Sequence, residues 1–520
     1  MTPGRIAAIA GAMGGLALLD FVGAMYAKEL AERPRVAAFT LGLLAFVVLF
    51  VAYAIVLRFF DLSIVTMGWI VLLQIGLLGL DWQRYGLRLD ARQVMAVVVI
   101  LVLQCYLIAS TADDPAQSAA STGQTGSPPA VGPARDPITA RPTPYLVLDL
   151  AVVEHQYDVL TDALPGVRTH YAVKANPAPE VLATLLRRGA AFDVASPAEI
   201  DACLAAGAAP TALSYGNTAK KERDIAYAYA RGVRTFTFDS AAELAKLQRH
   251  APGSTLLCRL ATTGAGADWA LSSKFGCAPD SARRLLETAW SAGHPVGLAF
   301  HVGSQQRDPT QWDEPLAATG RLQRELKAAG VPLTMLDIGG GFPATYRDPT
   351  PHLAAYGAAI RASLDRHVDL RGLAVIGEPG RSLVAAAGLI ETEVVLVAER
   401  GGARWVHLDV GLFGGLAEAL DESIQYRIKA PGNTGETGRV VLAGPTCDSV
   451  DVLYQRADYR LPLSLAAGDR VEIHAAGAYT ASYSSVGFNG LPPLATYIAP
   501  KHEPGQRPAG EVRLPVRQLA

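Results

Sequence analysis

Apolar residues are spread unevenly along the 520-residue chain and gather most densely in its first 110 positions. Four apolar runs lie there, at 6–27, 36–57, 62–80 and 91–109. Each has about 19–22 residues, enough to cross a bilayer as a helix. A secretory signal peptide accounts for one such run but not for four. The pattern therefore predicts an all-α transmembrane domain of four helices over 1–110, in contact with the lipid bilayer through residues 6–109.

The residues around these runs bear on where the protein lies. The first and third connecting loops hold most of the Lys and Arg residues, so the positive-inside rule places the chain after the fourth run outside the cell. The five cysteines form no CxxC pair, which argues against a disulfide framework or a zinc site and suits a reducing compartment. We expect a multi-pass protein of the cell membrane whose C-terminal part is cytoplasmic, against the charge bias of the loops.

Residues 111–142 are rich in Ser, Thr, Ala, Gly and Pro, which is typical of a flexible linker. From 143 to 385, short β-rich runs alternate with helical stretches. The expected strands are 168–173, 191–195, 212–215, 233–238, 255–260, 296–301, 334–338 and 373–377, and helices are expected at 179–188, 197–206, 219–231, 240–249, 280–292 and 313–329. Eight βα repeats over about 215 residues predict a TIM (β/α)8 barrel. A doubly wound sheet is the alternative, but its Gly-rich fingerprint does not follow the first strand.

After residue 385 the chain changes to strand runs with no helical stretches between them, at 389–398, 404–409, 439–443 and 470–475. This change predicts a separate C-terminal β domain over 386–505, followed by a tail at 506–520. A further strand at 145–149 precedes the barrel, and we expect it to pair with the barrel. A net charge of −2 gives no electrostatic reason to expect a nucleic acid partner.

The hexapeptide from Tyr171 to Asn176, YAVKAN, ends an expected strand on a single lysine, Lys174. A lysine at the end of a buried strand is costly unless its amine is used. One use is a Schiff base with pyridoxal phosphate (PLP), for which partial desolvation lowers the pKa of the amine. The alternative is a lysine that extends its ammonium into water. The hexapeptide by itself favours neither.

Further motifs follow the ends of expected strands, where TIM barrels carry their working residues. Asp193, His301, the glycines 339–341 and Glu378 all fall at such ends. A histidine there can stack on a flat ring, although a lone histidine is more often a core residue. Three glycines let the backbone approach an anion, and a glutamate facing a pyridine nitrogen keeps that nitrogen protonated. A tight turn and a surface Glu–Arg pair are the plainer explanations of the last two motifs.

The motifs YAVKAN, FDVAS, KFG, HVGSQ, GGGFP, EPGR, GPTCD and GAYT occur in this order between about residues 143 and 498. In this order and spacing they resemble the fold-type III PLP-dependent decarboxylases of basic amino acids, and more narrowly the bacterial ornithine/lysine decarboxylases. The resemblance implies a PLP-dependent carboxy-lyase that converts L-ornithine, or next L-lysine, to a diamine for polyamine biosynthesis. The first 110 residues lie outside the resemblance.

The resemblance also implies roles for individual residues. It makes Lys174 the Schiff-base lysine and Cys447 the acid that returns a proton to the α-carbon. His301 stacks on the cofactor ring and Glu378 holds the pyridine nitrogen. The other cofactor-binding residues that it implies are Asp193, Arg259, Ser304, Gly339, Gly340, Gly341, Pro379, Gly380, Arg381 and Tyr479, with Glu199 beside the lysine. For the substrate's distal ammonium it implies Asp409 and Asp448. In the family, Cys447 and Asp448 reach the site from the partner subunit, which implies a homodimer with shared active sites.

Several alternatives stay open. Diaminopimelate decarboxylase recognises a second carboxylate and typically has Cys-Glu where this chain has Cys447-Asp448. Regulatory pseudo-decarboxylases keep the fold but tend to lose the cofactor residues, which this chain retains. Alanine racemases pair the pyridine nitrogen with an arginine, so Glu378 argues against them. Asp20 lies inside the first apolar run, where a carboxylate is expensive and often functional. A protonated acid that hydrogen-bonds between helices is the plainer explanation, and a decarboxylase fused to a diamine-exporting membrane domain is the other.

Overall fold

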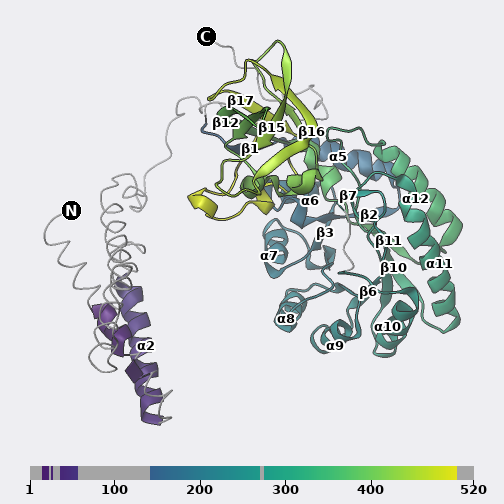
Figure 1. Ribbon diagram of the computed structural model, residues 1–520. Helices are drawn as coiled ribbons and strands as arrows, with labels where there is room; N and C mark the ends of the chain where they lie inside the picture. Colours follow the sequence, from purple (N-terminus) through teal and green to yellow (C-terminus); the bar gives the residue numbers. More distant parts are fainter. Residues whose placement is uncertain (1–14, 23–24, 27–35, 57–140, 270–273, 500–520) are drawn as a thin grey trace, which may run out of the picture. The chain divides into compact units, whose positions relative to one another are not determined.

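A computed structural model describes residues 15–22, 25–26, 36–56, 141–269 and 274–499 of the protein. The chain divides into two compact units, Met1–Pro133 and Ala134–Ala520. The first unit contains the helix α2 (Val36–Val56). The second contains the barrel and the β domain (Figure 1), and the candidate functional residues lie in it.

The expected membrane domain is not supported. Across the described ranges, the structure has no helix that is both long and apolar enough to cross a bilayer. This finding overturns the expected four-helix transmembrane domain and the multi-pass membrane location. An apolar run establishes composition alone, whereas a span also requires one continuous, sufficiently apolar helix of about 20 residues. The expected spans at 62–80 and 91–109 and most of 6–27 lie outside the described residues, as does the expected linker up to residue 140.

Eight parallel strands form a closed barrel in the second unit (Figure 1). In order around the barrel they are β10 (Leu333–Asp337), β11 (Ala374–Gly377), β2 (Val167–Ala172), β3 (Ala191–Val194), β4 (Leu213–Tyr215), β5 (Thr235–Phe238), β6 (Thr255–Arg259) and β8 (Val296–Ala299). Each coincides with an expected strand to within two residues at either end. Strands covered on both faces read as near-continuous apolar runs, which is why the sequence marked them clearly. The TIM-barrel prediction is confirmed.

Helices follow the strands and cover the outside of the barrel (Figure 1). They are α6 (Pro179–Arg187), α7 (Pro197–Ala205), α8 (Glu222–Ala230), α9 (Ala241–His250), α10 (Pro279–Ser291), α11 (Asp313–Ala328) and α12 (Leu353–His367), with α5 (Leu150–Ala163) ahead of β2. Their starts carry ordinary signals. Pro179, Pro197 and Pro279 occupy first turns, and the Ser196 and Ser240 side chains accept hydrogen bonds from backbone N–H groups of α7 and α9.

The β domain is an eight-stranded sheet. Its strands are β1 (Tyr145–Leu148), β12 (Gly388–Arg400), β13 (Ala403–Leu408), β14 (Arg427–Lys429), β15 (Thr437–Ala443), β16 (Val452–Pro462), β17 (Arg470–His474) and β18 (Ala495–Ile498). The prediction of a C-terminal β domain is confirmed. The predicted pairing of the first strand with the barrel is wrong, because β1 pairs antiparallel with β12 and parallel with β18. A closed barrel has no free edge that could accept another strand.

The parallel barrel places the carboxyl ends of all eight strands on one rim. The loops after β6 and β8 meet there as a small antiparallel pair, β7 (Ala267–Trp269) with β9 (Ser304–Gln306). The loop after β11 leads directly into the short helix α13 (Arg381–Val384). The rim therefore gathers loops from both halves of the barrel around one cavity.

Candidate active site

A cavity of about 210 Å³ lies at the rim of the barrel. Most of its wall comes from residues that directly follow barrel strands, and one wall comes from the β domain. The lining residues are Ala172, Lys174, Arg259, Trp269, Phe275, His301, Ser304, Gly341, Phe342, Glu378, Gly380, Arg381, Glu418, Tyr479 and Tyr483. Nine of them are residues that the sequence marked as candidates: Lys174, Arg259, His301, Ser304, Gly341, Glu378, Gly380, Arg381 and Tyr479.

Lys174 lies in the turn Val173–Ala175, immediately after β2. Its Nζ is 3.3 Å from Oδ2 of Asp193, a buried residue of β3. This carboxylate is the main reason why the pKa of Lys174 is raised above its ordinary value, and it outweighs the opposing effect of burial. The sequence led us to expect a lowered pKa from desolvation. The amine therefore has to give up a proton before it can act as a nucleophile.

Glu199 supports this arrangement from the first turn of α7. Its Oε2 accepts a hydrogen bond of 2.6 Å from the Ala195 N–H, at the end of the loop that follows Asp193. Burial raises the pKa of Glu199. The residue thus fixes the backbone beside Asp193, whereas the ion pair of Lys174 is made with Asp193.

Glu378 follows β11 and is hydrogen-bonded to Asp337, the last residue of β10. Asp337 also accepts a hydrogen bond of 2.8 Å from the Gly339 N–H. Burial raises the pKa of Glu378 well above its usual range and that of Asp337 to about 7. Two buried carboxyl groups in contact cannot both ionise cheaply, so the pair shares a proton when no cation faces it. The sequence analysis missed Asp337, although an acid at the end of a buried strand was an available signal.

His301 is buried deeply enough that its imidazole stays neutral. Burial, followed by the charge of Arg259, holds the pKa of His301 well below its ordinary value. Its Nδ1 accepts a hydrogen bond of 2.9 Å from the Gly303 N–H, which leaves the proton on Nε2. The guanidinium of Arg259 lies 5.2 Å from the centroid of the Phe275 ring. A neutral, flat ring is thus held at the cavity wall.

Arg381 is almost fully buried, and its charge is neutralised from the β domain. Its two terminal nitrogens each lie 2.6 Å from an oxygen of Glu418. The same guanidinium donates to the Ser304 hydroxyl at 2.9 Å and to the Tyr346 hydroxyl at 2.8 Å. The sequence analysis missed Glu418, because nothing near position 418 marks a partner for a residue 37 positions earlier. This ion pair joins the barrel rim to the β domain.

The glycines at the rim allow close approach between loops. Gly341 has a φ of +104°, and a Cβ there would lie 2.5 Å from the Gly303 carbonyl oxygen. A Cβ on Gly380 would lie 3.0 Å from the Ala175 Cβ and 3.4 Å from the Tyr479 hydroxyl. Tyr479 itself takes a φ of +54° and donates its N–H to the Ala175 carbonyl at 2.8 Å. Gly339, Gly340 and Pro379 complete the turns behind this wall, and Pro379 accepts from the Ala172 N–H at 3.0 Å.

Asp409, Cys447 and Asp448 are not among the residues that line the cavity of this single chain, and neither are Asp193, Glu199, Gly339, Gly340 and Pro379, which lie behind its wall. Asp409 accepts hydrogen bonds from the Thr392 hydroxyl at 2.5 Å and from the Glu393 N–H at 3.0 Å. Cys447 is exposed, with its Sγ 3.3 Å from Nδ2 of Asn489. Asp448 caps its own turn by accepting from the Val450 N–H at 2.9 Å.

Comparisons with known proteins agree with this geometry. Residues 150–385 match the family model for the pyridoxal binding domain of pyridoxal-dependent decarboxylases. The lysine/ornithine decarboxylase of Selenomonas ruminantium is 37% identical over 361 residues, covering 69% of this chain and 89% of that protein.

The chain belongs to the pyridoxal-dependent decarboxylases. The ornithine decarboxylase of Schizosaccharomyces pombe is 34% identical over 361 residues, covering 67% of this chain and 81% of that protein. Among solved structures, SrLDC in complex with PLP and cadaverine is 35% identical, with a TM-score of 0.64, covering 69% of this chain and 91% of that one. The protein is thus a PLP-dependent decarboxylase of the ornithine/lysine type.

The cavity fits PLP on its own residues. PLP is a flat aldehyde with a ring nitrogen and a phosphate. Three side chains of the cavity suit these features: the amine of Lys174, the neutral imidazole of His301 and the carboxyl group of Glu378. The pKa of Glu378 is raised, and a cationic ring nitrogen beside it would lower that pKa. Gly341 and Gly380 also line the cavity, and because they carry no side chain a phosphate can approach their backbone.

Replacing Asp193 by Asn should lower the pKa of Lys174. The carboxylate favours the ammonium, so its loss lets Lys174 deprotonate at lower pH, by about one to three pH units. The rate at which the PLP-free protein captures added PLP depends on the neutral amine, and we expect its pH midpoint to fall in D193N. The exposed Asp201, on α7, provides the control D201N. An unchanged midpoint in D193N would show that Asp193 does not set the protonation of Lys174.

Replacing Glu418 by Gln should destabilise the protein strongly, because Arg381 would keep its charge without a counter-ion. Removing one partner of a buried ion pair typically costs about 3–5 kcal/mol. We expect the urea midpoint of PLP-free E418Q to fall accordingly, with an unchanged slope. E436Q, at an exposed position of the same domain, serves as the matched control. Equal midpoints for the two variants would contradict the importance of this pair.

Proposed function

We propose that the protein decarboxylates a basic L-amino acid, L-ornithine with L-lysine as second substrate, to the corresponding diamine for polyamine biosynthesis. The observation that carries the proposal is the group formed by Lys174, Asp193 and Glu378 at one rim. The names of the relatives, lysine/ornithine and ornithine decarboxylase, support this choice of substrate. The reaction consumes one proton and releases CO2.

PLP, when bound, accepts the electron pair that remains when the bond to the carboxylate breaks. The remaining work falls to this chain's own groups. Lys174 provides the amine that holds the cofactor and yields to the substrate amine. Asp193 keeps a proton near the Lys174 nitrogen. Glu378 ionises when a protonated ring nitrogen faces it, because an adjacent cation lowers a carboxyl pKa. Neutral His301 offers a flat face without repelling that cation.

On the phosphate side, we assign binding to Ser304, the backbone of the glycines 339–341 and 380, and the Tyr479 hydroxyl. Both terminal nitrogens of Arg381 already donate to Glu418. We therefore assign Arg381 an indirect contribution to phosphate binding, in addition to its positive charge. Arg259, which lines the cavity near Phe275, is assigned to the wall behind the cofactor.

For the remaining steps, we assign Cys447 as the acid that protonates the α-carbon, and Asp409 and Asp448 as the acids that bind the distal ammonium. Cys447 and Asp448 lie outside the cavity walls of their own chain. This location supports a homodimer in which each subunit contributes them to its partner's cavity. Exposure of the Cys447 thiol on the single chain agrees with such a role.

The direct test is CO2 release by the purified full-length chain, loaded with PLP, from L-ornithine, L-lysine, L-arginine and meso-diaminopimelate. We expect turnover of ornithine and lysine that K174A abolishes. Preference for meso-diaminopimelate would replace the proposed substrate while leaving the reaction. Absence of CO2 from all four, in protein whose PLP absorbance shows a loaded site, would reject the proposal.

Shared active sites predict complementation between two inactive variants. We expect K174A and C447A each to be inactive, and their mixture to recover about a quarter of the wild-type activity, because half of the randomly formed dimers hold one intact site. The measurement is CO2 release before and after subunits are mixed and allowed to exchange. A mixture that stays inactive although mass spectrometry detects the mixed dimer would show that both residues act within one chain.

A further inference from the structure

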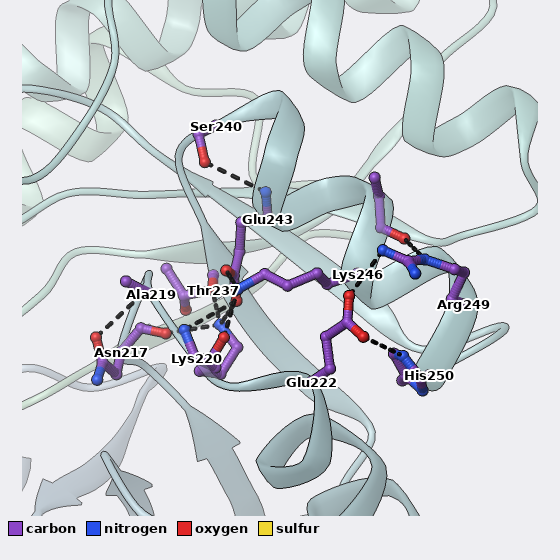
Figure 2. A network of polar contacts seen from close by, with 11 residues as sticks. Asn217, Ala219, Lys220, Glu222, Thr237, Ser240, Glu243, Lys246, Arg249 and His250 are labelled. Atoms are coloured by element: carbon purple, nitrogen blue, oxygen red, sulfur yellow. Dashed lines mark hydrogen bonds and ion pairs between the residues drawn. The ribbon is translucent and has the colours of Figure 1, made fainter. Parts of the chain in front are cut away.

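A second lysine, Lys220, is buried close to the active site but is not among the described residues that line its cavity. It lies between β4 and α8, and its side chain is 0% exposed. Its Nζ donates to the carbonyl oxygens of Asn217, at 2.6 Å, and Thr237, at 2.7 Å, and lies 3.0 Å from Oε1 of Glu243 (Figure 2). The three N–H groups of the ammonium therefore have three acceptors.

Glu243 anchors this ammonium from the first turn of α9. Its Oε1 also accepts from the Lys220 N–H at 3.2 Å. Its other oxygen pairs with Lys246, whose ammonium donates to the Lys220 carbonyl (Figure 2). Burial lowers the pKa of Lys220 to about 8, and Glu243 opposes that effect. Because one carboxylate serves two ammonium groups, removing Lys220 still leaves a neutral Glu243–Lys246 pair.

The two carbonyl groups that Lys220 binds belong to neighbouring strand ends. Thr237 is in β5, and Asn217 is the second residue after β4. Between β4 and Asn217 stands Gly216, which donates its N–H to the Val194 carbonyl at 3.0 Å. The ammonium therefore ties the loop that contains Gly216 to the adjacent strand.

Gly216 is the backbone wall behind two active-site carboxyl groups. A Cβ at this position would lie 2.2 Å from Oδ1 of Asp193 and 3.1 Å from Oε1 of Glu378. The loop at Gly216 is thus packed directly against Asp193, which faces Lys174, and Glu378, which is proposed to face the ring nitrogen. A small movement of the loop changes where both carboxyl groups can lie.

We propose that Lys220 is a positioning residue for decarboxylation, because its ammonium holds Gly216 against Asp193 and Glu378. The proposal rests on the roles given above to these two acids. Lys220 acts through the loop and does not touch substrate or cofactor. Misplacement of a catalytic group by about 1 Å can lower the rate about 100-fold. The hydrogen bonds from Lys220 to Asn217 and Thr237 therefore affect kcat as well as the stability of the fold.

The decisive comparison is K220M against K246M in the full-length, PLP-loaded protein. Both variants remove an ammonium from the network in Figure 2, but only K220M removes the bonds to the Asn217 and Thr237 carbonyls. We expect both to lower Tm. We expect K220M alone to lower kcat, by about 10- to 100-fold, with KM changed less than about threefold.

A spectroscopic readout separates positioning from stability. Asp193 raises the pKa of the Lys174 nitrogen, so a displaced Asp193 should move the pH midpoint of the visible band of bound PLP downward, by about one unit. K246M should keep the wild-type midpoint. The proposal is overturned if K220M matches K246M in both kcat and midpoint. K220Q, which keeps two N–H donors, replaces K220M if that variant does not fold.

A double-mutant cycle with G216A tests the route. The added methyl group meets Asp193 directly and should produce the same spectral shift. If Lys220 acts through Gly216, the kcat loss of K220M/G216A is smaller than the product of the two single losses. If the kcat loss of the double variant equals the product of the two single losses, Lys220 does not act through Gly216. The pH titration stays informative even if the chain decarboxylates none of the four amino acids, so failure of the proposed function is recognised separately.

Discussion

The parallel pairing of β2 with both β3 and β11 is the constraint on which the active site depends. Tyr171 pairs with Phe192 on one side, and Thr169 pairs with Gly377 on the other. This double pairing closes the barrel and places the turn that holds Lys174 between the strand ends that hold Asp193 and Glu378. A shift of one residue in either register would turn the side chains of that strand to the opposite face, and the amine would lose its neighbours.

Charge at the rim is balanced by pairs that come from distant segments. Lys174 faces Asp193, Arg381 faces Glu418, and Glu378 shares a proton with Asp337. Of these three pairs, only Glu378 with Asp337 contains no cation. Its protonation is therefore the most sensitive to a cation placed beside it. A cation placed beside Glu378 would favour its ionised form, because an opposite charge stabilises a carboxylate. Without a cation in contact with it, this buried pair keeps one neutral carboxyl group.

The sequence predicted the parts of this site that are local in the chain. Most barrel strands are short and rich in apolar or β-branched residues, and Lys174, His301 and Glu378 come within two residues of a strand end. The position of these residues along the chain was therefore enough to mark them. Glu418 and Asp337 were not predicted as site residues. Each acts through a partner that is distant in the chain, Arg381 in the barrel for Glu418 and Glu378 after another strand for Asp337. The pairing of β1 was wrongly predicted because apolar composition does not state which edge is free. The N-terminal runs misled similarly, since hydropathy describes composition and does not establish a membrane-crossing helix.

The pairing of β1 with β12 has a consequence for synthesis on the ribosome. Tyr145 hydrogen-bonds to Glu391, 246 residues later, so at about 5–20 residues per second the nascent strand waits on the order of 12–50 s for its partner. During that time its YLVL segment, fully buried in the finished protein, is exposed to solvent or to a chaperone. The barrel waits similarly, because β2 closes on β11. The barrel can therefore close only after β11 has been synthesised, and β1 is paired on both sides only after β18.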